Sequence, residues 1–150
     1  MASKKMLSEH FSEDEFRCKC GCGTLNVHPQ LIATLEQLRA LYGVPIKVTS
    51  GCRCRKHNNK PVKDGGAGGA PDSQHIADKT RPCRAADIKI KVKIKGYKAK
   101  DIADRIRDWQ SWDNRLNKNL EAIKGVGLYK KYPNLIHVDV REGKFTEWTH

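Results

Sequence analysis

Three places in the sequence bring metal-ligand residue types to a loop edge or a strand. His75 ends a glycine-rich stretch, Asp87 lies where that stretch feeds a strand, and His137 lies within an apolar run near the C-terminus. Two imidazoles and one carboxylate can hold a catalytic zinc ion that keeps its fourth position for water. Zinc bound there would lower the pKa of that water to about 7 and polarise a peptide carbonyl. Residue types alone leave the alternative that His75 is solvated and His137 is a packed core residue.

Helical spacing of apolar residues predicts the first group of elements that must position these side chains. Leucines at three- and four-residue steps predict a helix over Pro29–Tyr42, with a core formed by Leu31, Leu35, Leu38 and Leu41. Amphipathic spacing predicts further helices over 99–109 and 116–123. Ser12 with Glu15 has the form of a capping box and predicts a helical turn near 12–16.

Alternation of apolar and polar residues predicts strands over 45–50, 86–95, 126–129 and 135–140. The stretch 51–82 has no periodicity and is predicted to be a long loop, which in a small domain is usually functional or disordered. Helices and strands mix without a βαβ register. The predicted class is therefore α+β, with helices packed against a small, mainly antiparallel sheet. A chain of 150 residues fits one domain, 1–150, in which residues 1–6 are expected to be disordered.

Six cysteines are many for a chain of this length. Cys18, Cys20 and Cys22 form one group, Cys52 and Cys54 a second, and Cys83 stands alone. The C-x-C spacing differs from the C-x-x-C of common zinc knuckles and redox motifs. A disulfide between the groups, a structural metal and reduced thiols are the alternatives, and reduced thiols are the default in a reducing compartment.

Several short motifs follow one another in a fixed order along the chain. They are Thr49-Ser50-Gly51-x-Arg53, His57-Asn58, Gly68-Gly69-Ala70-x-x-Ser73-Gln74-His75, Ala85-Ala86-Asp87-Ile88, Gly125-Val126-Gly127 and Ile136-His137-Val138-Asp139-Val140-Arg141. This order resembles the D-Ala-D-Ala carboxypeptidase family of zinc peptidases, which includes murein endopeptidases, many of them encoded by phages. The stretch 16–23 resembles the small, phage-type members, and the likeness runs from about Leu7 to Trp148.

The resemblance implies a hedgehog/DD-peptidase-like fold and one catalytic Zn2+ held by His75, Asp87 and His137. It implies hydrolysis of peptide bonds next to D-amino acids in bacterial peptidoglycan, by a carboxypeptidase or an endopeptidase such as a phage endolysin. A non-catalytic module that binds the cell wall on the same fold is the alternative.

The spacing of the first two ligands departs from the family pattern S-x-H-x-x-G-x-A-x-D. His75 and Asp87 are twelve positions apart, so an insertion of five residues lies within 78–82, and Cys83 stands where the family has glycine. Extra loop length costs little entropy, so we expect the site to survive. A β-carbon at position 83 could shift its geometry, and Cys83 as an extra ligand is a further alternative.

Arg53 and Ser73 are the candidate substrate-binding residues. The resemblance implies that Arg53 grips the carboxylate or the scissile carbonyl of the substrate, for which a planar guanidinium is suited. The alternative is a surface arginine. Ser73 is expected to orient the site or the substrate as a hydrogen-bond donor.

The general base is expected on the last strand. Many relatives carry an acidic residue three positions before the final histidine, but this chain has Asn134, which cannot take a proton. Asp139 lies two residues beyond His137 and therefore on the same face of a strand. Asp139 is thus predicted as the general base. The alternative is a hydrogen bond that supports the site without proton transfer.

The formal net charge of +12 indicates an anionic binding partner, or it serves only solubility. Nucleic acid and an anionic polymer such as peptidoglycan would both be attracted. The basic residues are scattered rather than gathered beside aromatic residues, so nucleic-acid binding is not expected. No apolar run is long enough for a transmembrane helix and the N-terminus has no signal-peptide h-region. We therefore expect a monomer made in the cytoplasm that acts on the wall after release or export.

Overall fold

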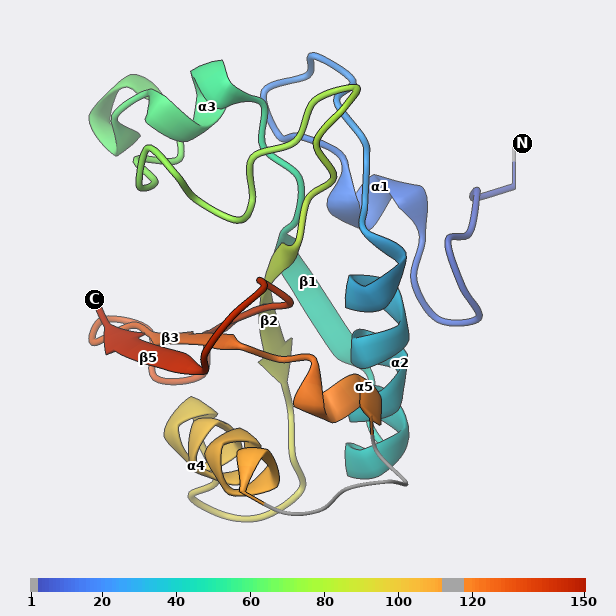
Figure 1. Cartoon of the computed structure of the whole chain (residues 1–150), viewed down its shortest axis with the longest axis vertical. Coiled ribbons are helices and arrows are strands. Elements are labelled where there is room, and N and C mark those ends of the chain that lie inside the picture. The colour runs from blue at the N-terminus through green and yellow to red at the C-terminus, as the bar shows by residue number, and fades with distance from the viewer. Residues whose placement is uncertain (1–2, 112–117) are drawn as a thin grey trace.

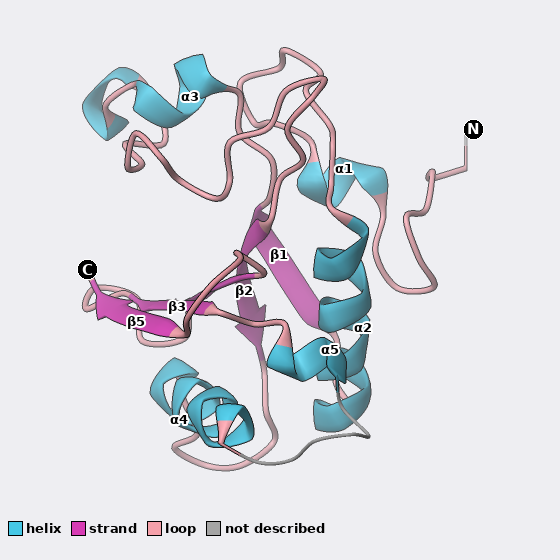
Figure 2. Cartoon of the chain, in the orientation of Figure 1, coloured by secondary structure: helices cyan, strands magenta, loops and turns pink. Residues whose placement is uncertain are grey.

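The computed structural model describes residues 3–111 and 118–150 (Figures 1 and 2). Within these two ranges, five strands form one sheet in the order β1-β2-β4-β3-β5, in which only the β3–β5 pair is parallel. The predicted α+β class with a mainly antiparallel sheet is confirmed. The strands are β1 (Ile46–Ser50), β2 (Ala85–Ile90), β3 (Gly125–Leu128), β4 (Ile136–Asp139) and β5 (Thr146–Thr149). The helices are α1 (Glu13–Phe16), α2 (Pro29–Tyr42), α3 (Arg55–Asn59), α4 (Ala99–Gln110), α5 (Lys118–Glu121) and the 3₁₀ turn η1 (Val62–Asp64).

Helix α2 begins and ends where its sequence signals predict. The Nδ1 atom of His28 accepts a hydrogen bond from the backbone N–H of Gln30 at 3.1 Å, and Pro29 occupies the first turn. Gly43 ends the helix in the left-handed conformation at φ 66°, which suits a residue without a β-carbon. The helix lies beside α5 (Figure 1).

The core is formed by α2, α4 and α5 together with one face of the sheet. Leu31, Leu35 and Leu38 are fully buried, but Leu41 is 40% exposed, so its assignment to the core was wrong. At 3.6 residues per turn, Leu41 is rotated by about 80° from Leu31 around the helix axis, which carries it off the buried face. Three- and four-residue steps keep residues on one face only when they alternate.

Strand β2 is shorter than the alternation over 86–95 predicts. It ends at Ile90, which pairs with Ile46 at the start of β1, and the chain then turns through Gly96 at φ 80°. Neither neighbouring strand continues past this point, and Ile94 is 60% exposed. Alternation alone cannot specify where the partner strands stop.

The segment between β1 and β2 contains two short helices that the sequence pattern did not predict, α3 and η1. Asn58 of α3 is fully buried, and its Nδ2 donates to the carbonyl of Ala70 at 2.8 Å. The backbone N–H of Gly69 donates to the carbonyl of Asn58 at 2.8 Å. This buried amide therefore holds the glycine-rich loop in a defined path.

The N-terminal segment and the last third of the chain can also be compared with the sequence predictions. Lys5 and Met6 of the segment expected to be disordered make backbone contacts with Glu13 and Ser12. Of the helix predicted over 116–123, residues 116 and 117 lie outside the described part, and α5 covers 118–121. Strand β5 was not predicted. Among the described residues, no helix is both long and apolar enough to cross a membrane.

We predict that Leu35→Ala lowers the free energy of unfolding by about 2–5 kcal/mol, because it removes a fully buried side chain from the centre of the core. Leu41→Ala, a matched change on the same helix, is expected to cost less than about 1 kcal/mol. Chemical denaturation of both variants measures the difference. Equal losses would contradict the assignment of the buried face.

Candidate metal centre

Strand register brings Asp87 and His137 together on the face of the sheet opposite the core. In the antiparallel β2–β4 pair, Asp87 is directly opposite His137. Ile136 and Val138 of β4 are buried in the core, so His137 and Asp139 between and beyond them point to the other face. The predicted shared face of His137 and Asp139 is confirmed. Asp87 and His137 are fifty positions apart in the sequence, and the register makes them direct cross-strand neighbours.

His75 reaches this face from the loop between β1 and β2. Its carbonyl accepts from the backbone N–H of Arg53 at 2.8 Å, and its own N–H donates to Ser73 Oγ at 3.2 Å. Its Nδ1 donates to the carbonyl of Gly51 at 2.7 Å. Because a carbonyl can only accept, Nδ1 carries the proton and Nε2 presents a free lone pair.

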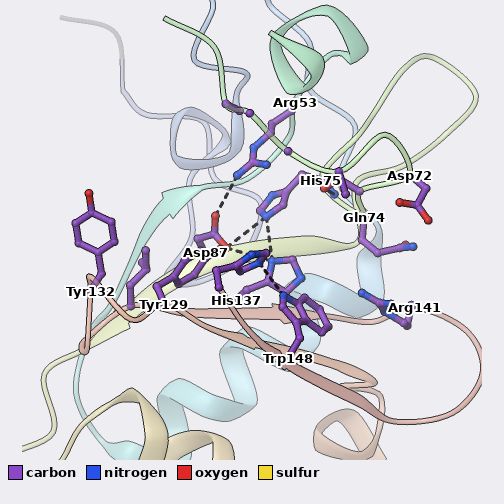
Figure 3. A pocket seen from close by; sticks show the side chains of 17 residues that line it. Arg53, Asp72, Gln74, His75, Asp87, Tyr129, Tyr132, His137, Arg141 and Trp148 are labelled. Carbon is purple, nitrogen blue, oxygen red and sulfur yellow. Dashed lines mark hydrogen bonds and ion pairs between the residues drawn. The ribbon is translucent and has the colours of Figure 1, made fainter. Parts of the chain in front are cut away.

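Three ligand atoms form a nearly equilateral triangle (Figure 3). His75 Nε2 lies 3.2 Å from His137 Nδ1 and 3.4 Å from Asp87 Oδ1, and the latter two atoms are 3.2 Å apart. A tetrahedral zinc ion with ligands at 2.0–2.1 Å requires edges of about 3.3–3.5 Å. The described side chains therefore fit a zinc ion with three protein ligands and one open position.

The charges of His75 and Asp87 suit metal binding. Burial lowers the pKa of His75, and the neighbouring Asp87 carboxylate only partly opposes this, so the imidazole is neutral. Burial alone would raise the pKa of Asp87, but the electrostatic effect of the adjacent His75 and His137 outweighs it and holds the pKa well below its usual range. A neutral imidazole and an ionised carboxylate are the forms that bind a cation.

Asp139 contacts His137 at Nε2, the ring nitrogen that does not face the triangle. His137 Nε2 lies 2.8 Å from Asp139 Oδ2, while Arg141 donates to both oxygens of the same carboxylate, at 2.8 Å to Oδ1 and 2.7 Å to Oδ2. Burial would raise the pKa of Asp139, but the bonds from Arg141 and His137 outweigh it and lower the pKa to about 2. The ionised Asp139 accepts a hydrogen bond from the Nε2–H of His137, and this tautomer leaves Nδ1 as the ligand atom of His137.

These contacts favour one of the two roles considered for Asp139. Its side chain is fully buried, it does not line the pocket, and both of its oxygens are occupied. A carboxylate with a pKa of about 2 and no free lone-pair direction toward the pocket is a poor proton acceptor. The supporting hydrogen bond, rather than proton transfer, agrees with this geometry. Asn134 is exposed and does not line the pocket.

Two glycines of β3 make room for this arrangement. A β-carbon at Gly125 would overlap the carboxylate of Asp139, its cross-strand partner, and one at Gly127 would lie 2.7 Å from Trp148 Nε1. The Trp148 ring in turn lies 5.1 Å from the His137 ring, and the Arg141 guanidinium lies 5.0 Å from the Trp148 ring. The Gly125-Val126-Gly127 motif thus serves close packing beside the ligand strand.

A second set of side chains surrounds Asp87. Arg53 Nη2 donates to Asp87 Oδ2 at 3.1 Å, and its Nε donates to Ser50 Oγ at 3.1 Å. The Tyr129 hydroxyl donates to Asp87 Oδ1 at 2.9 Å, and burial raises the pKa of that hydroxyl, with Asp87 adding to the effect. Arg53 is therefore not a free surface arginine. Tyr129 was missed, because a tyrosine at a strand end has no distinguishing sequence signal.

The triangle lies in a cavity of about 530 Å³. Arg53, Ser73, His75, Asp87 and His137 all line it, so the structure brings together every predicted site residue except Asp139. Trp148 also lines the cavity. Further lining side chains are Asp72, Gln74, Tyr129, Tyr132, Leu135, Arg141 and His150.

The predicted insertion does not disturb the site. Asp78 Oδ1 accepts from the backbone N–H groups of Thr80 and Arg81 at 2.8 and 2.7 Å, which closes residues 78–81 into a local turn. Cys83 is fully buried and its thiol donates to the carbonyl of Ala85 at 3.1 Å. Its β-carbon is accommodated, and the described metal-ligand cluster of His75, Asp87 and His137 does not include it.

Comparison with known protein families gives a match over most of the chain. The model of the family described as peptidase M15 matches residues 9–139. Neither the curated proteins nor the solved structures gave a significant match. Members of this family are zinc-dependent metallopeptidases of the D-Ala-D-Ala carboxypeptidase-like type, and the three clustered ligands agree with that. The match covers most of the sequence, ligand residues included, and the chain therefore belongs to the peptidase M15 family.

Proposed function

We propose that this protein is a zinc-dependent peptidase that hydrolyses peptide bonds next to D-amino acids in the stem peptides of bacterial peptidoglycan, after release or export. The observation that carries the proposal is the triangle of His75 Nε2, Asp87 Oδ1 and His137 Nδ1, with separations of 3.2–3.4 Å, inside a cavity. A bound zinc ion supplies Lewis acidity and an activated water nucleophile at neutral pH.

The residues around the triangle prepare it for that ion. Gly51 and Asp139 fix the tautomers of the two imidazoles, so each presents an unprotonated nitrogen to the same point. Arg53 and Tyr129 hold the Asp87 carboxylate in place. Outer partners of this kind typically change metal affinity or activity by 10- to 100-fold when removed.

The cavity also suits an anionic peptide. Arg53 and Arg141 both line it, and Arg53 retains N–H groups beyond the one bonded to Asp87 Oδ2. A guanidinium can form paired, charge-assisted hydrogen bonds with a carboxylate, and peptidoglycan stem peptides carry carboxylates at and near their C-termini. The net charge of +12 would raise the local concentration of an anionic wall polymer.

We predict that His75→Ala and Asp87→Ala each lose the catalytic zinc and abolish release of amino groups or free D-alanine from purified peptidoglycan, because two ligands do not hold the ion at its working affinity. Zinc analysis and mass spectrometry of the digested stem peptides measure both effects. His10→Ala is the matched control, because His10 pairs with Glu36 away from the cavity. Unchanged zinc and turnover in both site variants would defeat the proposal, whereas zinc and wall binding without turnover in the native protein would favour a binding module.

Asp139→Asn tests the role of that carboxylate. We expect a 10- to 100-fold weaker zinc affinity, because a neutral amide is a weaker hydrogen-bond acceptor for the Nε2–H of His137 than the carboxylate is. Most activity is expected to return at saturating zinc. Zinc titration with parallel rate measurements separates the two effects. Activity that stays lost in a fully zinc-loaded variant would instead indicate proton transfer by Asp139.

Arg53→Lys tests substrate binding. Loss of a charge-assisted hydrogen bond of about 1.5–3 kcal/mol is expected to lower kcat/KM roughly 10- to 150-fold while zinc content is retained. Steady-state kinetics on a peptide ending in D-Ala-D-Ala measure the change. If kcat/KM is unaffected, Arg53 serves only to hold Asp87.

A further inference from the structure

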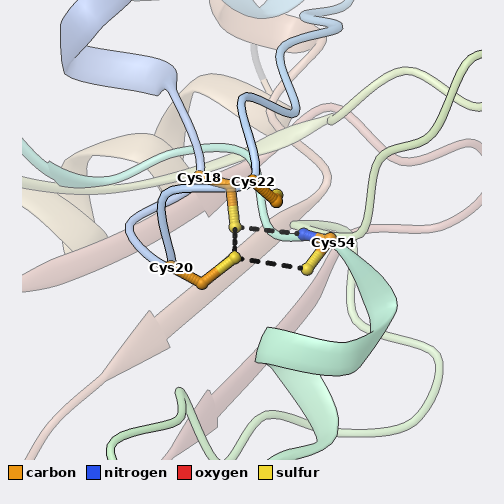
Figure 4. A group of neighbouring side chains, drawn as sticks. All are labelled: Cys18, Cys20, Cys22 and Cys54. Carbon is orange, nitrogen blue, oxygen red and sulfur yellow. Dashed lines mark hydrogen bonds between the residues drawn. The ribbon is translucent and has the colours of Figure 1, made fainter.

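Four of the six cysteines converge about a point that is separate from the His75–Asp87–His137 triangle (Figure 4). The loop after α1 contributes Cys18, Cys20 and Cys22, and Cys54 lies at the start of α3. Cys18 Sγ lies 3.5 Å from Cys20 Sγ, which lies 3.7 Å from Cys54 Sγ. All four sulfur atoms lie within 4.8 Å of one another.

These separations distinguish between the possible states of the thiols. A disulfide requires two sulfur atoms at about 2.05 Å, and all six cysteines are free in the structure. A tetrahedral zinc ion with Zn–S distances of about 2.3 Å requires S···S edges of about 3.8 Å. The measured distances of 3.5 and 3.7 Å are close to that edge. Thiol–thiol hydrogen bonds are weak and do not by themselves explain why four side chains converge.

Hydrogen-bond donors from the surrounding chain also point at the sulfur atoms. The backbone N–H of Cys54 donates to Cys18 Sγ at 3.3 Å, and that of His57 donates to Cys54 Sγ at 3.3 Å. The Thr24 hydroxyl lies 3.1 Å from Cys22 Sγ and can donate to it once the thiol has lost its proton. Donors aimed at sulfur stabilise thiolates, which are the form that binds a metal.

We propose that Cys18, Cys20, Cys22 and Cys54 bind a second, structural zinc ion as four thiolates. The four sulfur atoms fill a tetrahedron and leave no open position, so this ion would have no catalytic role. Cys20 and Cys22 are exposed, which gives the ion a path of entry, and binding would release the thiol protons.

The position of the cluster gives this ion a defined task. Cys54 directly follows Arg53, whose backbone bonds to His75 and Ala77 on both sides. A bond from Cys54 to the 18–22 loop through the metal would therefore anchor the segment that carries Arg53 and supports His75. The sequence spacing did not predict this set of four ligands, because the fourth, Cys54, lies 32 positions beyond Cys22.

Metal analysis of the full, untagged chain tests the proposal. We expect about two zinc ions per chain in the native protein and about one in Cys20→Ser and in Cys54→Ser. His75→Ala is also expected to keep about one, now held by the cysteines alone. Cys52→Ala is the matched control, because Cys52 is a buried thiol outside the cluster, and it should keep both ions.

Cobalt substitution locates the ion without relying on the folding of the cysteine variants. The native protein and His75→Ala loaded with Co2+ should both show an intense sulfur-to-cobalt charge-transfer band of a tetrahedral thiolate site. The proposal would be overturned if neither protein showed this band. It would also be overturned if metal analysis found iron in place of zinc, or if the intact mass showed disulfides among these four cysteines. Because the two zinc sites share no ligand, loss of the thiolate band leaves the proposed peptidase site standing, and the reverse also holds.

Discussion

The arrangement depends on one constraint: two imidazoles and a carboxylate must present unprotonated ligand atoms to a single point while buried among charged neighbours. His75 Nε2, His137 Nδ1 and Asp87 Oδ1 lie 3.2–3.4 Å from one another. Gly51, Asp139, Arg53 and Tyr129 each hold one member of the set in the orientation that a metal requires. Outer hydrogen bonds, rather than the ligands alone, therefore define the site.

The sheet and the loop supply the ligands by different means. The β2–β4 register fixes Asp87 opposite His137, and burial of the alternate residues Ile136 and Val138 prevents the strand from slipping. His75 depends on a long loop that has few apolar anchors, and buried polar groups such as Asn58 take over that function. The cysteine cluster lies at the base of the same loop.

Much of this could be predicted from the sequence, and the failures have physical reasons. Helix α2 carries strong cap signals at both ends and was therefore predictable. The resemblance of the ordered motifs to a known family named His75, Asp87 and His137 as candidate ligands, and the structure brings these three side chains together. Strand β5 and the end of β2 depend on which strand lies alongside, which local alternation does not encode. Tyr129 and the convergence of Cys54 on the 18–22 loop arise from contacts between distant segments. Asp139 was placed on the correct face, but its bonds to Arg141 could not be read from spacing.

The most direct measurement is a crystal structure of the zinc-loaded protein with anomalous scattering collected at the zinc edge. We expect a peak within the triangle, about 2.0–2.1 Å from His75 Nε2, Asp87 Oδ1 and His137 Nδ1, with a fourth position facing the cavity. A fully loaded crystal with no peak among these three atoms, or with zinc bound through His137 Nε2, would contradict it.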